Sequence, residues 1–281
     1  MPIDLTTPES HFAFGENWSE YSKLIDDRRV AAAESDLARM LGRRDLSGKR
    51  FLDIGSGSGL HSLAAVRLGA QSVVAIDIDA DSVATTKKIL SKFAPSASWS
   101  ARQASVFELD PAEIGEFDVV YSWGVLHHTG DLDRAISCAA ALVAPGGLFA
   151  LALYRRVWMD WFWKFEKKWY AFASPSAQSW ARRAYIGAFL PRMLLAGASP
   201  RSYLESYLQN RGMSFEHDVH DWLGGWPYES ISAGELHARM ATGGFRSLCA
   251  SEASLGLVRT AGRKIGLFGS GCDEYVFERV S

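Results

Sequence analysis

The sequence predicts an α/β fold built on a doubly wound, mostly parallel sheet. From Lys49 onward, short runs of apolar and β-branched residues alternate with segments whose apolar residues recur at helical spacing. The strand-like runs have few polar interruptions, which is typical of parallel strands covered by helices on both faces. A glycine-rich turn joins the first strand-like run to the first helical segment. Together these patterns indicate consecutive units of strand, helix and strand.

The elements of this sheet are expected in a regular order between residues 50 and 154. We expect Asp81 to cap the second helix, and Pro145 with the glycines after it to end the third. Because parallel strands share one direction, the loops that follow them should meet at one edge of the sheet. The predicted strands are 50–55, 72–78, 99–107, 115–123 and 148–154, and the predicted helices are 60–69, 81–93 and 131–147.

The alternation stops after Tyr154 and resumes at about Ser232 with a helix and two more strands. An insertion after the fifth strand would lie beside the crevice at the carboxyl ends of the strands, so we expect a lid or substrate-binding unit there. The predicted organisation is an N-terminal helical and aromatic cap at 1–45, the core at 46–154, a helical, aromatic-rich insertion at 155–231, and a C-terminal helix with strands that complete the sheet at 232–281.

Composition excludes several classes of protein. Of 281 residues, 48% are hydrophobic and 22% charged, which fits a globular chain with a full core and argues against disorder. A net charge of −2 gives no overall attraction to nucleic acid. The three cysteines form no CxxC pair, and neither a signal peptide nor a transmembrane segment is expected. We therefore expect a cytoplasmic protein, and the sequence leaves its oligomeric state open.

The segment FLDIGSGSGLHS, residues 51–62, carries glycines between a predicted strand and a predicted helix. Glycine lets the backbone turn tightly and approach a ligand closely, and a helix start presents unpaired N–H groups. Asp77 ends the next strand, where a carboxylate can accept hydrogen bonds from a ribose diol. The spacing is GxGxG and not GxGxxG, which argues against a nicotinamide dinucleotide as the ligand.

Four segments in this order resemble the motifs of the Rossmann-like, class I S-adenosylmethionine-dependent methyltransferases: LDIGSGSG, AIDID, FDVVYSWGVLHHTGD and LVAPGGLFALALY. The segments at 11–21, 211–229 and 266–278 are similar to a bacterial subgroup of these enzymes that acts on small molecules. The sequence departs from the family at Arg155, where relatives often carry asparagine. The resemblance implies S-adenosylmethionine as the cofactor and a small molecule as the partner.

The resemblance also implies which residues contact the cofactor. Gly55 and Gly57 would face its methionine portion, and Asp77 would bind its ribose. Asp53 looks like the acid that orders the loop or reaches the amino group of the cofactor. The adenine would lie against Ile78, the residue after the second-strand acid, and against Ser105 and Val106 in the loop after the third strand.

Aromatic residues are expected to cover the cofactor, because a sulfonium cation is stabilised against an aromatic face. Phe14, Trp18 and Tyr21 are spaced for such a cap, although anchoring of the N-terminal helix explains them equally well. Trp123, at the end of the fourth predicted strand, is a further expected cofactor contact.

Histidines in two places are candidates for a catalytic base. His127 and His128 follow the fourth strand, and at most one of these neighbours should face a substrate. His217 and Asp221 would share a face either on a helix or on a strand, as a base with its orienting carboxylate. A purely structural role is equally open for each. No further ligands follow at a recognisable spacing, so no metal site is expected.

Aromatic residues between Trp158 and Phe172 recur at helical intervals with lysines among them, which predicts an amphipathic helix. Ten basic and only three acidic residues lie between positions 155 and 211. The simplest interpretation is that the helix packs the lid onto the sheet. The alternatives are an interfacial helix at anionic lipid, a cationic pocket for an anionic substrate, or a dimer surface.

Three functions are compatible with these features. The first is transfer of the methyl group of S-adenosylmethionine to an O, N or C atom of a small molecule. The second keeps the cofactor but changes the chemistry to cyclisation or fragmentation, with release of methylthioadenosine. The third is a protein that senses the nucleoside or binds a partner without turnover. The nucleoside product separates the first two, and a variant that no longer binds the cofactor tests the third.

Overall fold

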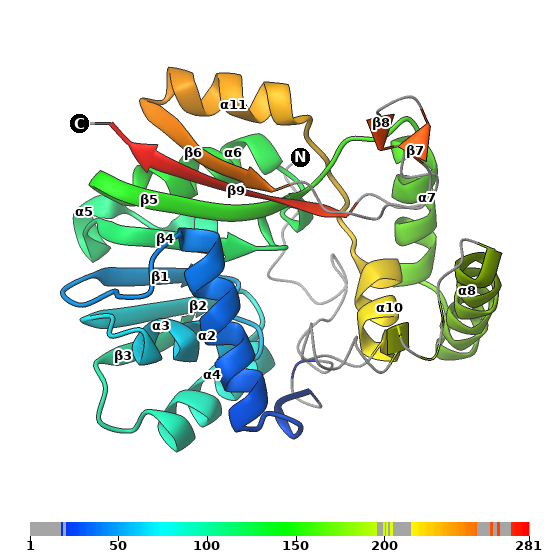
Figure 1. Cartoon of the computed structure of the whole chain (residues 1–281), viewed down its shortest axis with the longest axis horizontal. Helices are drawn as coiled ribbons and strands as arrows, with labels where there is room; N and C mark the ends of the chain where they lie inside the picture. Colours follow the sequence, from blue (N-terminus) through cyan, green and yellow to red (C-terminus); the bar gives the residue numbers. More distant parts are fainter. Residues whose placement is uncertain are drawn as a thin grey trace.

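A seven-stranded sheet forms the centre of the computed structural model, which describes residues 18, 21–195, 199, 201, 203, 204, 215–251, 259, 260, 263, 264 and 271–280 (Figure 1). The strand order is β3-β2-β1-β4-β5-β9-β6. The first five strands are parallel, and β9 pairs antiparallel with β5 and β6. This confirms the predicted mostly parallel, doubly wound sheet. The strands are β1 (Arg50–Ile54), β2 (Ser72–Asp77), β3 (Trp99–Gln103), β4 (Phe117–Trp123), β5 (Val143–Tyr154), β6 (Phe245–Ser251) and β9 (Cys272–Arg279), and β7 (Arg259–Thr260) pairs separately with β8 (Arg263–Lys264).

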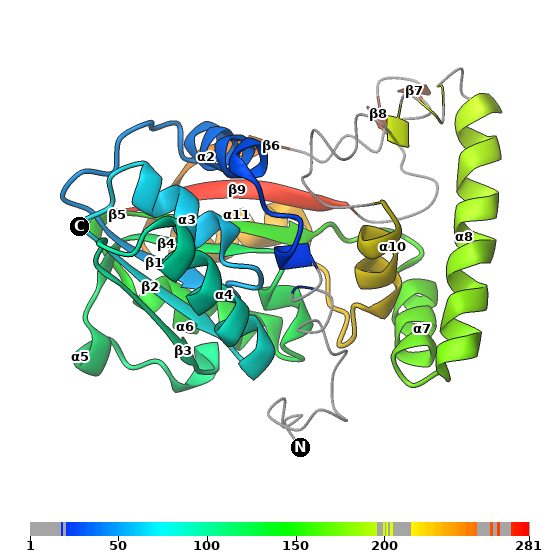
Figure 2. The same cartoon turned by 90° about the horizontal axis from the view of Figure 1, so that it is seen from below.

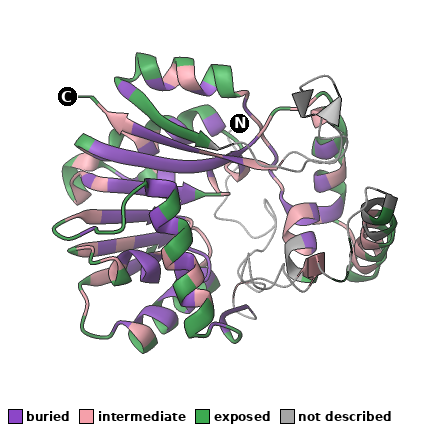
Figure 3. Ribbon diagram, viewed as in Figure 1, coloured by how far each residue is buried: buried purple, intermediate pink, exposed green. Residues whose placement is uncertain are grey.

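Helices cover both faces of the sheet, because successive strand residues point to opposite sides. Phe51 packs with the apolar residues of two helices on one face, and its neighbour Leu52 packs with those of two helices on the other face. Figure 3 shows the central strands as the most deeply buried part, with exposed residues on the outer faces of the helices. The helices of the core are α2 (Asp27–Leu41), α3 (Leu60–Arg67), α4 (Ala80–Phe93), α5 (Pro111–Ile114), α6 (Leu132–Ala141) and α11 (Ala233–Thr242).

Three predicted boundaries were wrong by a few residues. Asp79 and not Asp81 caps α4, because the Asp79 carboxylate accepts hydrogen bonds from two backbone N–H groups of the first turn. β5 begins at Val143, since the segment around Pro145 lies in an irregularity of the pairing with β4 and does not end the preceding helix. β3 ends earlier than predicted, because Ser105 turns the chain into the short helix η2 (Val106–Glu108).

The segment after β5 forms a helical unit beyond the carboxyl end of that strand (Figures 1 and 2). It contains α7 (Asp160–Ala171), α8 (Pro175–Leu195) and α10 (Phe215–Gly224). Tyr170 of α7 and Val219 and Leu223 of α10 form its small apolar core. None of the helices in the described part of the chain combines the length and apolarity needed to cross a bilayer. We refer to residues 155–231 as the lid.

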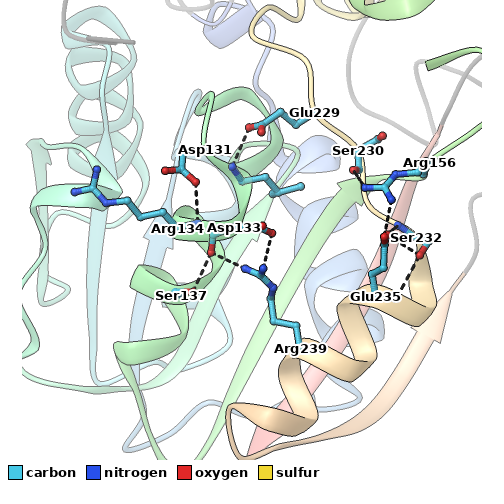
Figure 4. A network of polar contacts seen from close by, with 11 residues as sticks. Asp131, Asp133, Arg134, Ser137, Arg156, Glu229, Ser230, Ser232, Glu235 and Arg239 are labelled. Carbon is cyan, nitrogen blue, oxygen red and sulfur yellow. Dashed lines mark hydrogen bonds and ion pairs between the residues drawn. The ribbon is translucent and has the colours of Figure 1, made fainter. Parts of the chain in front are cut away.

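Polar contacts fix the segment that returns from the lid to the core (Figure 4). The Glu229 carboxylate accepts a hydrogen bond of 2.9 Å from a backbone N–H at the start of α6. Arg239 on α11 pairs with Asp133 on α6 at 2.7 Å. Arg156, just after β5, pairs with Glu235 at the start of α11 at 2.6 Å. Both ends of the lid are therefore tied to the same side of the core.

The departure from the family pattern at Arg155 has a structural explanation. Its guanidinium donates hydrogen bonds to both carboxylate oxygens of Asp273, at 2.8 and 2.6 Å. This pair lies where the end of β5 pairs with the start of β9. The Asp273 side chain is only 3% exposed. A bidentate pair of this kind holds both groups in one orientation. Arg155 therefore joins the start of the lid to the last strand.

We expect Asp273→Asn to lower the free energy of unfolding by about 3 kcal/mol, because it leaves the Arg155 guanidinium without its buried carboxylate. Urea denaturation followed by circular dichroism measures the change. Glu278→Gln is the matched control on the same strand, since Glu278 pairs with an Arg246 side chain that is 68% exposed. That exposed pair should contribute less than about 1 kcal/mol. Equal losses in the two variants would contradict a structural role specific to Arg155 and Asp273.

Candidate cofactor and active site

The candidate site lies at the carboxyl ends of β1, β2, β3 and β4. The chain builds the sheet outward from β1 through β2 to β3, and then returns to place β4 on the other side of β1. The helices that follow β1 and β4, α3 and α6, therefore cover opposite faces of the sheet, and folds of this type have their ligand crevice at that point. The glycine loop follows β1, and the residues after β4 form the facing side.

Two glycines of the loop permit contacts that a side chain would block. Gly55 has a φ of +78°, and a Cβ atom added to it would lie 2.3 Å from Cγ2 of Val125, which follows β4. Gly57 has a φ of +52°, and its added Cβ would lie 3.0 Å from the indole of Trp18. Gly55 thus lets the loops after β1 and β4 meet, and Gly57 lets the ring of Trp18 lie directly against the loop backbone.

Asp77 is bonded to the glycine loop. Its Oδ2 accepts a hydrogen bond of 2.9 Å from the Gly57 N–H, and its Oδ1 accepts one of 3.0 Å from the Asp79 N–H. A carboxylate has about four acceptor positions, so each oxygen of Asp77 can accept a further hydrogen bond. The acid predicted to bind a ribose therefore also holds the loop predicted to face the methionine portion.

Asp53 occupies a different position, beneath the loop. Its side chain is buried, and its Oδ2 accepts a hydrogen bond of 2.5 Å from the Ser62 hydroxyl on the first turn of α3. This contact is with the helix that follows the loop, so the role of Asp53 toward the loop or the cofactor stays a prediction. Burial raises the pKa of Asp53 to about 7 and that of Asp77 to about 6.

These raised pKa values predict that S-adenosylmethionine binds more weakly in acid. The cofactor is cationic at sulfur, so it should favour the ionised carboxylates and release protons when it binds. With a pKa of about 6 for Asp77, the affinity should be about tenfold lower at pH 5 than at pH 7. Calorimetry at both pH values, in two buffers of different ionisation enthalpy, measures affinity and proton release together. Equal affinity with no proton release would contradict this linkage.

The residues predicted to border the adenine lie together at the ends of β2 and β3. The Gln103 side chain donates a hydrogen bond of 2.9 Å to the Ile78 carbonyl, which links the two strand ends. Ser105 caps η2, since its hydroxyl accepts from the Phe107 N–H at 3.3 Å. Val106 is buried in the core beside β2. Ile78 and Ser105 remain partly exposed, so their surfaces are available to a ligand.

The predicted aromatic cap is partly described. Trp18 lies against Gly57 and meets the ring of Tyr21 edge-on, with 5.9 Å between ring centroids. Tyr21 is itself buried in the core, and burial raises its pKa to about 12. Phe14 lies outside the described residues. Trp18 thus lies over the glycine loop, and the buried Tyr21 anchors the segment that carries it, while the contact of Trp18 with the cofactor stays a prediction.

Trp123 ends β4 beside this loop and is 36% exposed. Its indole N–H donates a hydrogen bond of 3.0 Å to Glu274 on β9. Glu274 also accepts hydrogen bonds of 2.9 and 3.2 Å from Arg39 on α2. Sequence patterns gave no signal for Glu274, because it lies 151 positions after the tryptophan that it orients.

The two neighbouring histidines have different environments. His127 is fully buried, its Nδ1 accepts from the Tyr154 N–H at 3.3 Å, and its Nε2 has no hydrogen-bond partner among the described residues. His128 is less deeply placed, and its Nδ1 lies 2.7 Å from the Pro227 carbonyl. Nδ1 therefore carries a proton and donates a hydrogen bond to that carbonyl, and a backbone hydrogen bond with Gly225 also holds the ring. Burial lowers the pKa of His128 to about 4, so its ring is neutral at pH 7.

An unpredicted buried cation lies where the lid meets the core. Lys167 of α7 is fully buried, and its ammonium donates to the Trp222 carbonyl and lies 3.8 Å from the centroid of the Trp222 ring. The rings of Tyr154 and Tyr228 are each 5.7 Å away. Burial lowers the pKa of Lys167. Its place on the same side of α7 as Trp163 and Tyr170 is the one sequence signal that could have indicated it.

The second histidine cluster lies on α10, so the helical alternative is correct. The helix brings positions 217, 220 and 221 within about one turn of each other. His220 Nδ1 lies 2.7 Å from the Tyr170 hydroxyl and 3.0 Å from Arg182, contacts that join α10 to α7 and α8. The side chain of His217 is outside the described residues, so its pairing with Asp221 stays a prediction. Over the part of the chain that is described, no three potential metal ligands gather.

Comparison with known proteins decides the family. A model described as "Methyltransferase domain" matches residues 25–246, which include strands β1 to β5, the glycine loop and the lid. The chain belongs to this methyltransferase family. The match confirms the resemblance drawn from the four motifs and, with it, S-adenosylmethionine as the cofactor.

Curated relatives match about two fifths of this chain. A ubiquinone biosynthesis O-methyltransferase from Bradyrhizobium sp. (strain ORS 278) is 38% identical over 113 residues, which are 40% of this chain and 43% of the relative. The protein of that name from Brucella ovis is 37% identical over 114 residues, 40% of this chain and 44% of the relative. The aligned region thus spans less than half the length of these relatives.

Solved structures share the fold at low sequence identity. Magnesium protoporphyrin IX methyltransferase from Synechocystis PCC 6803, with bound SAM, has a TM-score of 0.51 at 13% identity and covers 90% of this chain and 80% of its own. A [4+2]-cyclase has a TM-score of 0.51 at 14% identity and covers 88% of this chain and 79% of its own. These likenesses confirm the α/β fold class.

Proposed function

We propose that this chain transfers the methyl group of S-adenosylmethionine to an O, N or C atom of a small molecule. The observation that carries the proposal is the 2.9 Å hydrogen bond from the Gly57 N–H to Asp77. It holds the loop and the ribose-binding acid together at the edge where ligands bind in doubly wound sheets. Membership of the methyltransferase family supports the same reaction.

The cofactor would be held by residues that fit it. Gly55 and Gly57 leave the loop backbone open to the methionine portion, and Asp77 has acceptor positions left for the ribose hydroxyls. Trp18 would exclude water from the loop and place an aromatic face near positive charge. When bound, S-adenosylmethionine supplies an electrophilic methyl group. The task of the protein is then to align the acceptor with that methyl group and to remove a proton where the acceptor has one.

We place the acceptor between the end of β4 and the lid. Trp123 offers an exposed aromatic face there, and Glu274 fixes its indole. Tyr154, which lies at the end of β5 against Lys167, would form the opposite boundary at the start of the lid. An acceptor with apolar surface suits these walls. The relatives named O-methyltransferase favour oxygen as the atom modified.

For an oxygen acceptor, we propose His128 as the base. Its Nδ1 is held by the Pro227 carbonyl, its ring is neutral at pH 7, and it follows the strand that borders the crevice. His127 is less suited, because its ring is fully buried. His128→Gln should lower kcat and leave the Kd for S-adenosylmethionine unchanged. A Kd that rises in parallel with the fall in kcat would instead indicate a structural role.

Incubation of the protein with methyl-labelled S-adenosylmethionine and a metabolite extract tests the function. We expect label in a small molecule, with S-adenosylhomocysteine as the nucleoside product, and in Asp77→Asn a much lower rate at S-adenosylmethionine concentrations below its raised Kd. Methylthioadenosine formed without any acceptor would overturn methyl transfer in favour of cyclisation or fragmentation. Binding without any product would support a sensor.

A further inference from the structure

Helix α7 has aromatic residues on two opposite sides. Trp163, Lys167 and Tyr170 are buried against α10 and the core. A second row, at intervals of three or four residues, is exposed to solvent. Its members are Trp161 (69% exposed), Phe165 (71%), Trp169 (48%) and Phe172 (59%). The buried row explains how the lid is held together, and the exposed row has no such role.

This exposed row is part of a larger concentration. Among the described residues, every exposed tryptophan and phenylalanine except Trp123 lies between positions 158 and 180. The first turns of α8 add Trp180, 74% exposed, and its end adds Leu194, 63% exposed. Figure 2 shows α7 and α8 side by side at the end of the molecule farthest from the core helices. Large apolar patches of this kind on a folded protein usually mark a binding surface.

The charge on this surface has one sign. Between positions 158 and 195 the acidic residues are Asp160 and Glu166, and neither is exposed. Asp160 accepts hydrogen bonds from Tyr228 and Ser230 inside the lid. The exposed charged side chains described in this range are all basic: Lys164, Lys168 and Arg183. Lys168 also borders a shallow apolar groove formed by Phe165, Trp169, Phe172 and Ala173.

We propose that the exposed residues of α7 and α8, from Trp158 to Leu194, form a docking surface for an anionic lipid bilayer. Tryptophan and phenylalanine with lysine and arginine around them are the residues with which peripheral helices enter the interface of such membranes. Two copies of this surface would bring like charges together, whereas acidic headgroups complement it. The inference goes beyond the proposed function and does not depend on it.

Docking would place the lid, and not the cofactor loop, at the membrane. The opposite side of α7 carries Lys167, which lies against Tyr154 at the end of β5. A bilayer on the exposed side would therefore lie one helix away from the proposed acceptor region. An acceptor with a long apolar part could then be withdrawn from the membrane without first crossing water. The arrangement agrees with the apolar walls proposed for the acceptor.

Flotation of the full chain with vesicles tests the docking surface. Vesicles of phosphatidylcholine with phosphatidylglycerol should bind wild-type protein at least tenfold more tightly than vesicles of phosphatidylcholine alone. Trp161→Gln with Phe165→Gln, and separately Lys164→Glu with Lys168→Glu, should each weaken binding at least tenfold. Matched controls are Leu248→Gln, an apolar residue 47% exposed on β6, and Lys87→Glu with Lys88→Glu on exposed positions of α4. These controls should bind within twofold of wild type.

Several results would overturn the proposal. They are absence of binding to the anionic vesicles, equal binding by the α7 variants and their controls, and an oligomer in sedimentation velocity that the Trp161 and Phe165 changes dissociate. The last result would assign the surface to a second copy of the chain. Because the substituted side chains are exposed, the variants should keep the thermal midpoint of wild type, and their affinity for S-adenosylmethionine should not change. That retained affinity separates failure of docking from failure of the proposed function.

Discussion

Gly55→Ala should lower the free energy of unfolding by about 3 kcal/mol and abolish measurable binding of S-adenosylmethionine. A φ of +78° costs a residue with a Cβ about 1 kcal/mol. The new methyl group would also lie 2.3 Å from Cγ2 of Val125, and relief of such a clash costs roughly a further 1–3 kcal/mol. The loops after β1 and β4 must separate to accommodate it, which displaces the glycine loop from the position in which it would face the cofactor. Denaturation and calorimetry measure the two effects.

Two further variants separate the clash from the backbone conformation. Gly124→Ala has nearly the same φ, +77°, but an added Cβ meets nothing within 4 Å. It should cost only about 1 kcal/mol. Val125→Gly combined with Gly55→Ala removes the clashing side chain and should restore part of the lost affinity. Equal losses of stability and affinity in Gly55→Ala and Gly124→Ala would contradict the claim that Gly55 is needed for the close approach of the two loops.

Asp77→Asn should raise the Kd for S-adenosylmethionine by about 100-fold, which corresponds to about 3 kcal/mol. The amide keeps the size of the side chain but replaces one acceptor oxygen with a donor, which faces either a backbone N–H or a ribose hydroxyl. Since one oxygen remains to hold the Gly57 or the Asp79 N–H, the thermal midpoint should fall by only a few degrees. Calorimetric titration of the folded variant measures the Kd.

Asp81→Asn is the matched control for this change. It removes the same charge from an exposed position on the first turn of α4, four residues away. A Kd within twofold of wild type is expected, because a solvated carboxylate contributes little to a ligand that it does not touch. A similar loss of affinity in both variants would show that Asp77 acts only through its negative charge. It would contradict a hydrogen bond between Asp77 and the ribose.

The parts of the fold that the sequence predicts well are those with local causes. Strands, the glycine loop and the position of Asp77 follow from apolar runs and glycine chemistry over a few residues. The errors arise where two local solutions compete. Asp79 and Asp81 are both able to cap α4, and only the path of the chain after β2 selects the first. Pro145 ends helices as readily as it sits in a strand irregularity, so the start of β5 was placed too late.

The candidate site was less predictable, because its supporting contacts join distant parts of the chain. Glu274 orients Trp123 from the last strand, and no pattern near either residue indicates the other. In α7 both sides carry aromatic residues, so helical periodicity alone could not say which row packs inward. Lys167 is buried only because aromatic rings from three other segments surround it.

Calorimetric titration of the wild-type chain with S-adenosylmethionine tests the central claim most directly. We predict one bound molecule per chain at neutral pH, with binding that Asp77→Asn weakens about 100-fold and Asp81→Asn leaves unchanged. Absence of binding heat up to about 1 mM ligand, the upper end of usual KM values, would contradict a site for S-adenosylmethionine at the glycine loop and Asp77.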